Sequence, residues 1–299
     1  MHKLLRFESF SLHGRKTPTE HTTMNEDALV IAHTLFAVID GATDRSGTRI
    51  EQKTSGAFLA DYLHRHLTHI AQEAIYAETE AVMLLCGLNR AFGEKLAEDH
   101  PNIAALGFYE GPAAAACLIK LHSDNSYSYA IASDCALVEI GHHGEVFVAP
   151  EVEKPYHIEK NRLDLALRLM KEQNISFEKA LQTPEYQEAY RNFRKLLNHE
   201  WSVVNGDPSL ENIVLHGRRP LEGVAALVLM TDGMFLPGSP EKKGAEMAAR
   251  QMLEHGISAY ANGLKTVYDA DQTREKFRRF KHMDDATALL LQFKIPLKN

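Results

Sequence analysis

Four short apolar runs, far apart along the chain, each meet an aspartate at one end, and this pattern restricts the fold more than any other sequence feature. Asp27 and Asp284 each precede a run, whereas Asp40 and Asp232 each follow one. If the runs are strands of one core, the four carboxylates can converge on one edge. Clustered carboxylates repel one another in a partly dry site unless a cation compensates them. Because the donors are all oxygens, the pattern predicts a site for Mg²⁺ or Mn²⁺.

Each of these aspartates also has a simpler explanation. Asp40 and Asp232 are followed by Gly41 and Gly233, and an Asp-Gly pair after a strand is a common turn. The same glycines suit a metal site, because a backbone without a Cβ atom can approach an ion and offer its carbonyl oxygen. The metal interpretation therefore depends on the four aspartates occurring together.

The order of the expected elements indicates the fold class. Strand-like runs come in pairs with short connections, at 27–31 and 34–39, 113–121 and 126–133, and 136–140 and 145–149. Helical periodicity covers 47–70, 75–96 and 241–267, and two polar helices are expected between 150 and 200. Further strands are expected at 224–230 and after Asp284. Strands linked as hairpins form antiparallel sheets, so the sequence predicts a layered α+β protein rather than a doubly wound parallel sheet.

Composition limits the partners and the compartment. A net charge of −7 over 299 residues gives no general attraction to nucleic acid or to anionic membranes. The longest fully apolar runs, such as 113–119 and 224–230, are far shorter than the roughly 20 residues of a membrane-spanning helix. The N-terminal segment lacks an apolar core, so we expect no secretory signal. The three cysteines, Cys86, Cys117 and Cys135, form no CxxC pair, which favours a reducing, cytoplasmic location.

Five segments carry a resemblance to a known family. They are NEDA (25–28), FAVIDG (36–41), IASDCALVEI (131–140), VLMTDG (228–233) and DDATALLL (284–291). In this order they resemble the motifs of the metal-dependent type 2C protein phosphatases, the PPM family, over about residues 20 to 293. The resemblance implies a four-layer αββα sandwich, with two antiparallel β-sheets flanked by helices. It also implies one phosphatase-like domain over 1–299, with a helical flap insertion at about 150–205.

The resemblance further implies a two-metal site. Asp40 would bridge two Mn²⁺ or Mg²⁺ ions, and Gly41 would give its carbonyl oxygen to one of them. Asp232 and Asp284 would hold the other ion, and Asp27 would bind metal-coordinated water. Two such ions activate a water for direct attack on phosphorus, so that Asp40, Asp232 and Asp284 would act in catalysis through this water.

The chain departs from the family pattern at several positions. Ala42 stands where many members carry a basic residue or histidine that could protonate the leaving group. Thr22 stands where many carry the arginine that binds substrate phosphate, and Arg45 and Arg49 are candidates to replace it. Either arginine could instead be a surface residue at a helix start. Leu236 stands where some members have an aspartate for a third ion.

Two segments admit a functional and a plain interpretation. We expect the segment at about 150–205 to govern substrate choice, and the alternative is a peripheral pair of solvated helices. The basic run 274–282, directly before Asp284, is either a solvated helix face or a docking site for an acidic phosphopeptide.

These observations predict a metal-dependent phosphatase that acts on phosphoserine and phosphothreonine in phosphorylated proteins. A phosphatase of a small phosphorylated metabolite is an alternative, because the missing phosphate-binding arginine leaves room for it. A catalytically silent, phosphatase-like binding module is a third possibility, against which the retained Asp40, Asp232 and Asp284 argue.

Overall fold

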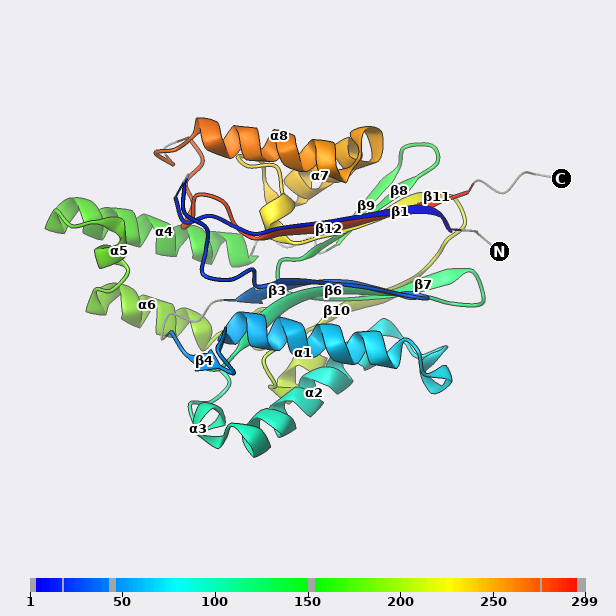
Figure 1. The fold of residues 1–299 in the computed structure, drawn as a ribbon, viewed down its shortest axis with the longest axis horizontal. Coiled ribbons are helices and arrows are strands. Elements are labelled where there is room, and N and C mark those ends of the chain that lie inside the picture. Colours follow the sequence, from blue (N-terminus) through cyan, green and yellow to red (C-terminus); the bar gives the residue numbers. More distant parts are fainter. Residues whose placement is uncertain (1–3, 18, 43–46, 150–153, 275, 295–299) are drawn as a thin grey trace.

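The computed structural model describes residues 4–17, 19–42, 47–149, 154–274 and 276–294. Two five-stranded antiparallel sheets lie face to face, and helices cover the outer face of each sheet (Figure 1). The predicted α+β sandwich with four layers is therefore confirmed. No helix in the described part of the chain combines the length and the apolar character needed to cross a bilayer.

The first sheet joins the two ends of the chain. In spatial order it contains β1 (Leu4–Leu12), β12 (Ala286–Phe293), β11 (Val224–Met230), β8 (Ala136–Gly141) and β9 (Val146–Ala149). Helices α7 (Glu241–His255) and α8 (Ile257–Ala270) cover its outer face (Figure 1). Strand β12, which follows Asp284, thus pairs directly with β11, which precedes Asp232.

The second sheet contains, in order, β10 (Leu215–Pro220), β7 (Ser126–Ala132), β6 (Ala113–Leu121), β3 (Leu35–Ala42) and β2 (Asp27–Ala32). Helices α1 (Ser55–Ile70) and α2 (Ala81–Asp99) cover it. Smaller elements complete this half: β4 (Arg49–Ile50), β5 (Lys53–Thr54), the 3₁₀ turn η1 (Ala74–Tyr76), α3 (Pro101–Ala104) and η2 (Pro208–Asn212).

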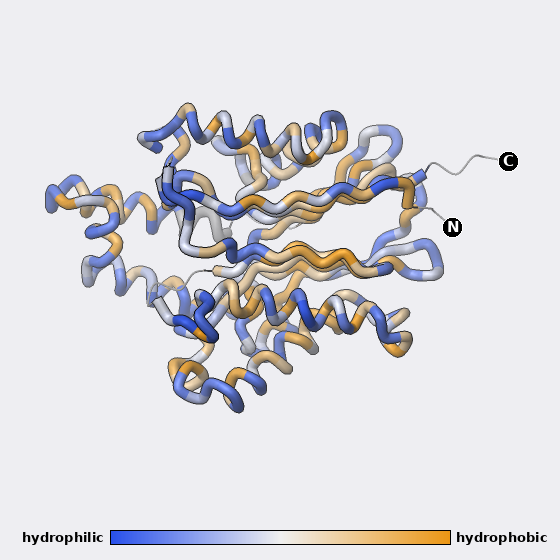
Figure 2. Tube along the Cα trace, viewed as in Figure 1, coloured by the Kyte–Doolittle hydropathy of each residue, from blue (hydrophilic) through white to orange (hydrophobic). Residues whose placement is uncertain are grey.

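Three apolar layers hold the sandwich together, which explains the continuous apolar runs of the central strands. Successive strand residues point to opposite faces. In β3, Val38 packs between the two sheets and Ile39 packs under α1 and α2. In β11, Leu229 packs between the sheets and Val228 packs under α7 and α8. Figure 2 shows the hydrophobic residues concentrated along these strands.

Two expected helices differ from the observed ones. The first begins at Ser55 rather than near residue 47, because β4 and β5 form a small hairpin and the Thr54 hydroxyl caps α1 by accepting the Ala57 N–H. The helix expected at 241–267 is two helices, α7 and α8, which meet at Gly256. Its φ of 86° lies in the left-handed region that favours glycine, so the helix cannot continue through it.

A helical segment lies beside one end of the sandwich (Figure 1). It consists of α4 (Lys154–Gln173), α5 (Phe177–Ala180) and α6 (Pro184–Arg194). Pro184 occupies the first turn of α6, where its missing N–H costs no hydrogen bond. Ala166, Leu169 and Tyr186 are buried in a small core of this segment's own.

The end of β3 touches the start of α1 through two glycines. A Cβ atom added at Gly56 would lie 2.6 Å from the carbonyl carbon of Gly41, and one added at Gly41 would lie 2.5 Å from that of Gly56. Both contacts are with backbone, which cannot rotate away. The Gly41 N–H also donates to the Glu26 carbonyl at 3.0 Å. Helix α1 therefore presses directly on the turn that follows Asp40.

We predict that Gly56→Ala destabilises the protein, because overpacking against a fixed backbone typically costs about 1–3 kcal/mol. Gly87→Ala is the matched control: Gly87 lies in α2, and a Cβ atom there meets open space. That control should be neutral or stabilising by up to about 1 kcal/mol. Urea unfolding gives both values, and equal effects of the two substitutions would contradict the close contact.

Candidate metal centre

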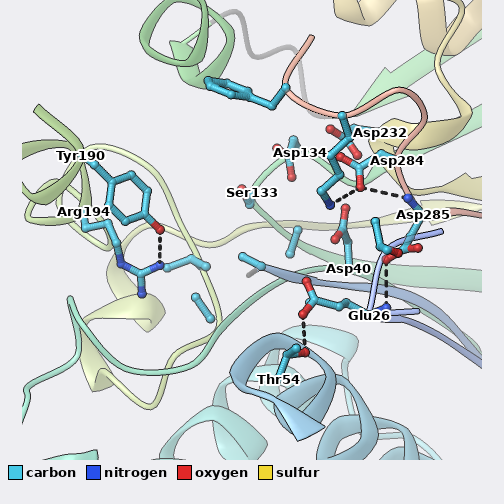
Figure 3. A pocket seen from close by; sticks show the side chains of 18 of the residues that line it. Glu26, Asp40, Thr54, Ser133, Asp134, Tyr190, Arg194, Asp232, Asp284 and Asp285 are labelled. Carbon is cyan, nitrogen blue, oxygen red and sulfur yellow. Dashed lines mark hydrogen bonds and ion pairs between the residues drawn. The ribbon is translucent and has the colours of Figure 1, made fainter. Parts of the chain in front are cut away.

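The strand pairing brings the predicted aspartates to one end of the sandwich. Asp27 and Asp40 are directly opposite each other across the β2–β3 pair. At the same end, Asp232 begins the 3₁₀ turn η3 (Asp232–Met234) after β11, and Asp284 lies two residues before β12. A cavity of about 420 Å³ opens here. Its carboxylate lining comprises Glu26, Asp40, Asp134, Asp232, Asp284 and Asp285. Figure 3 shows these groups on one side, with Tyr190 and Arg194 opposite.

Asp285 fixes the rim of this cavity. Its buried carboxylate accepts the Gly14 N–H at 2.6 Å through Oδ1 and the Glu26 N–H at 2.9 Å through Oδ2. The Glu26 side chain in turn accepts a short hydrogen bond from the Thr54 hydroxyl at the start of α1. Asp285 is therefore committed to the backbone between β1 and β2, and it positions Glu26 rather than facing the cavity as a free ligand.

Thr231 connects the two sheets at the site. Its hydroxyl donates to Asp27 Oδ2 at 3.0 Å and accepts the Thr287 N–H at 2.9 Å. Asp27 is half-buried, and its Oδ1 is buried with no hydrogen-bond partner among the described residues. A buried carboxylate oxygen without a donor is costly. This oxygen is thus a position where positive charge would stabilise the structure.

The carboxylates disturb one another's ionisation. Loss of solvation, and to a smaller extent the charges of Asp285 and Asp284, raise the pKa of Asp27 to about 8. Loss of solvation and the carboxylates of Asp27, Asp232 and Asp284 raise the pKa of Asp40 well above its usual range. Both shifts favour the protonated forms, because the site neither solvates nor neutralises the ionised carboxylates well.

One lysine supplies part of the missing positive charge. The Lys281 Nζ lies 2.5 Å from Asp284 Oδ1, and this same oxygen accepts the Asp285 N–H at 2.9 Å. Burial opposes the charge of Lys281, but the carboxylates of Asp284 and Asp40 outweigh it and raise the pKa of the ammonium. Lys281 therefore stays protonated beside Asp284.

The donor set suits hard divalent ions in kind, because it consists of oxygens alone. The unpaired Asp27 Oδ1 and the raised pKa of Asp40 both favour added positive charge. Over the described ranges, however, no three His, Cys, Asp or Glu side chains are arranged to hold a metal ion as they stand. Asp284 in particular is occupied by Lys281. The donors therefore fit divalent ions in kind but not in their present arrangement.

The other predicted positions are distributed as follows. Gly41, Ala42 and Thr22 line the cavity. Arg49 is exposed, donates to the Gln52 carbonyl at 2.8 Å, and does not belong to the described cavity lining. Arg45 lies outside the described residues.

The wall opposite the carboxylates comes from the helical segment and the chain after it. Tyr190, Phe193 and Trp201 line the cavity there. Arg194 ties α6 to the sandwich: its guanidinium donates to the Tyr109 carbonyl and, at 2.7 Å, to the Gly111 carbonyl. These contacts close the cavity on a second side.

Solved structures resemble the chain along nearly its whole length. A bacterial serine phosphatase matches with 15% identity and a TM-score of 0.58, over 98% of each chain. The serine/threonine phosphatase Stp1 from Staphylococcus aureus matches with 16% identity and a TM-score of 0.55, over 98% of this chain and 96% of Stp1. The catalytic domain of the phosphatase PstP, in complex with two manganese ions, matches with 16% identity and a TM-score of 0.56, over 98% and 99%.

The chain has the fold of the PPM-type serine/threonine phosphatases. Comparison by sequence adds nothing to this, since no protein-family model and no curated protein matches the chain. At these identities the likeness establishes the PPM-type fold, and the chemistry has to be argued from the residues of the site.

Sequence reasoning missed several residues of the site, Lys281 and Arg162 among them. Lys281 stands three positions before Asp284, and this spacing was the available signal. The basic run 274–282 is not a helix face: its described residues form an irregular segment between α8 and β12, which brings Lys281 into the cavity. Arg162, on α4, also lines the cavity and lies over the rings of Tyr190 and Phe193. No motif marks it.

We predict that Mn²⁺ binding releases protons at about pH 7, because Asp27 is protonated below its pKa of about 8 and a divalent charge favours its ionised form. The release should shrink towards about pH 9, above the pKa of Asp27. Calorimetric titration in buffers of different ionisation enthalpy measures the number of protons. Binding enthalpies that do not depend on the buffer would contradict the raised pKa values.

Proposed function

We propose that this protein is a metal-dependent phosphomonoester hydrolase that removes phosphate from phosphoserine and phosphothreonine in proteins. The observation that supports it most is the meeting of carboxylates from both sheets in one cavity without enough positive charge to neutralise them. The PPM-type fold supports the same activity, since its solved examples include serine/threonine phosphatases.

The proposed ligands are those expected from the sequence. Asp40, the Gly41 carbonyl, Asp232 and Asp284 would hold two Mn²⁺ or Mg²⁺ ions, and Asp27 would bind metal-coordinated water. PstP has been crystallised with two manganese ions, which supports this number. When bound, such ions supply a water nucleophile near neutral pH and offset charge on the phosphoryl oxygens.

The surrounding residues would keep these ligands in place. The Thr231 hydroxyl orients the Asp27 carboxylate, and the Gly41–Gly56 contact fixes the turn after Asp40. Asp285 holds the backbone of Glu26 at the rim. These contacts would hold Asp27, Asp40 and Glu26 in place, whereas Asp284 would first have to leave Lys281.

We also propose that the chain is a single phosphatase-like domain and that α4, α5 and α6 form its flap. Tyr190 and Phe193 of α6 line the cavity, which supports a role of this segment in substrate choice. The residues that flank a phosphoserine would contact this aromatic wall.

The free thiols of Cys86, Cys117 and Cys135 support a cytoplasmic location.

One observation favours the small-metabolite alternative. The cavity volume of about 420 Å³ lies within the range of small-molecule sites, about 300–1,000 Å³. Values of kcat/KM for phosphopeptides and for small phosphomonoesters, measured side by side, decide between the two substrate classes.

We predict that the protein hydrolyses a chromogenic phosphomonoester with Mn²⁺ or Mg²⁺ and loses this activity in chelator. Asp40→Asn and Asp232→Asn should each lower kcat/KM by at least about 10²-fold, since metal charge stabilisation is worth several kcal/mol. Asp99→Asn is the control, because Asp99 ends α2 and pairs with Lys95 at the surface. Full activity in excess chelator would contradict the proposed mechanism. Activity of the Asp40→Asn variant equal to that of the wild-type protein would contradict the role of Asp40.

A further inference from the structure

The described cavity lining contains four basic side chains, Lys16, Arg162, Arg194 and Lys281, and two of them have other partners. Arg194 donates to the carbonyls of Tyr109 and Gly111. Arg162 donates to the Tyr186 hydroxyl at 3.2 Å and stacks on aromatic rings. Lys281 differs from both, because its partner is a carboxylate that the proposed function needs for metal binding.

The backbone that carries Lys281 is firmly held. The Arg279 guanidinium donates to the Asp271 carboxylate at 2.6 Å and to the carbonyls of Asp271, Phe277 and His282 at 2.8, 2.6 and 2.6 Å. The Arg279 side chain is mostly buried against this segment. Lys281 stands two residues from this anchor, so any change of its contacts has to come from its own side chain.

The residues that follow Lys281 are fixed as well. The His282 ring is buried and contacts Asp269 through Nε2 at 3.1 Å. The backbone of Met283 exchanges hydrogen bonds with that of Arg15, at 2.7 and 3.0 Å. By contrast, the Lys281 side chain is 32% exposed and faces the cavity. A lysine side chain, with its flexible four-carbon stem, can change rotamer while its backbone stays in place.

Asp284 cannot serve Lys281 and a divalent ion equally. A carboxylate that binds a divalent cation no longer offers its full charge to an ammonium, and the two positive groups repel each other at this range. The displaced ammonium then needs another anion nearby. In a phosphatase cavity that anion is the phosphate dianion of the substrate, to which lysine binds as a point charge.

We propose that Lys281 is an exchangeable counter-ion: it neutralises Asp284 in the metal-free protein and binds the substrate phosphate once Asp284 has taken a divalent ion. This inference rests on the proposed function. It assigns phosphate binding to Lys281, on the segment between α8 and β12, rather than to Arg45 or Arg49, the candidates expected from the sequence. It also makes phosphate affinity depend on bound metal.

The test uses Lys281→Met, which keeps the length of the side chain and removes its charge. Calorimetry should give a Kd for Mn²⁺ that is lower by about tenfold, because the competing cation is gone, and a Kd for orthophosphate on the Mn²⁺-loaded protein that is higher by about tenfold, the size expected for one charge-assisted hydrogen bond. Lys281→Arg should retain orthophosphate binding. Lys95→Met, at an exposed lysine of α2 that pairs with Asp99 and is not in the described cavity lining, should change neither value.

An unchanged Kd for either ligand in a folded Lys281→Met protein would overturn the inference, as would equal effects of Lys95→Met. Melting curves establish folding, and Lys281→Gln replaces the methionine variant if that one does not fold. These readouts do not require turnover. If the wild-type protein hydrolyses no phosphomonoester while both affinities shift as expected, the proposed function fails and the exchange of Lys281 stands.

Discussion

The structure depends on negative charge held at the edge of two apolar sheets. Strands β2, β3, β11 and β12 bury their residues in three hydrophobic layers, and their pairing forces Asp27, Asp40, Asp232 and Asp284 towards one end. Burial removes much of the solvation of Asp27 and Asp40. The protein responds in three ways: the pKa values of Asp27 and Asp40 rise, Thr231 donates to Asp27, and Lys281 pairs with Asp284. Divalent ions would neutralise the carboxylates in place of bound protons and Lys281, while Thr231 would still orient Asp27.

The carboxylates around the cavity divide into two kinds. Each carboxylate oxygen of Asp285 accepts a backbone N–H, and these two hydrogen bonds link the start of β12 to the chain before β2. Asp40 lies beside several like charges. Adjacent residues therefore differ: Asp285 fixes the backbone at the rim, whereas Asp284 would exchange Lys281 for a divalent ion under the proposed mechanism. Such a division lets a site hold strong unbalanced charge without losing its shape.

Much of the fold and of the candidate site could be predicted from the sequence. The remaining features escaped prediction, and each did so for a physical reason. The hairpin of 27–31 with 34–39 predicts that Asp27 and Asp40 are neighbours, because the register of a tight hairpin is fixed by its turn. Strand β10 escaped prediction because it is an edge strand, with a polar sequence that alternates around exposed positions. Lys281 and Arg162 escaped it because irregular segments and helices from distant parts of the chain bring them to the cavity, and no local period encodes that meeting.

The contact between Gly41 and Gly56 has a consequence beyond stability. Since backbone meets backbone there, neither position can accept a side chain without displacing the other. The orientation of helix α1 is then tied to the place of the Asp40 carboxylate. Substitutions in the half of α1 away from Gly56 that tilt the helix should therefore change the affinity for metal, although the substituted residues lie far from Asp40.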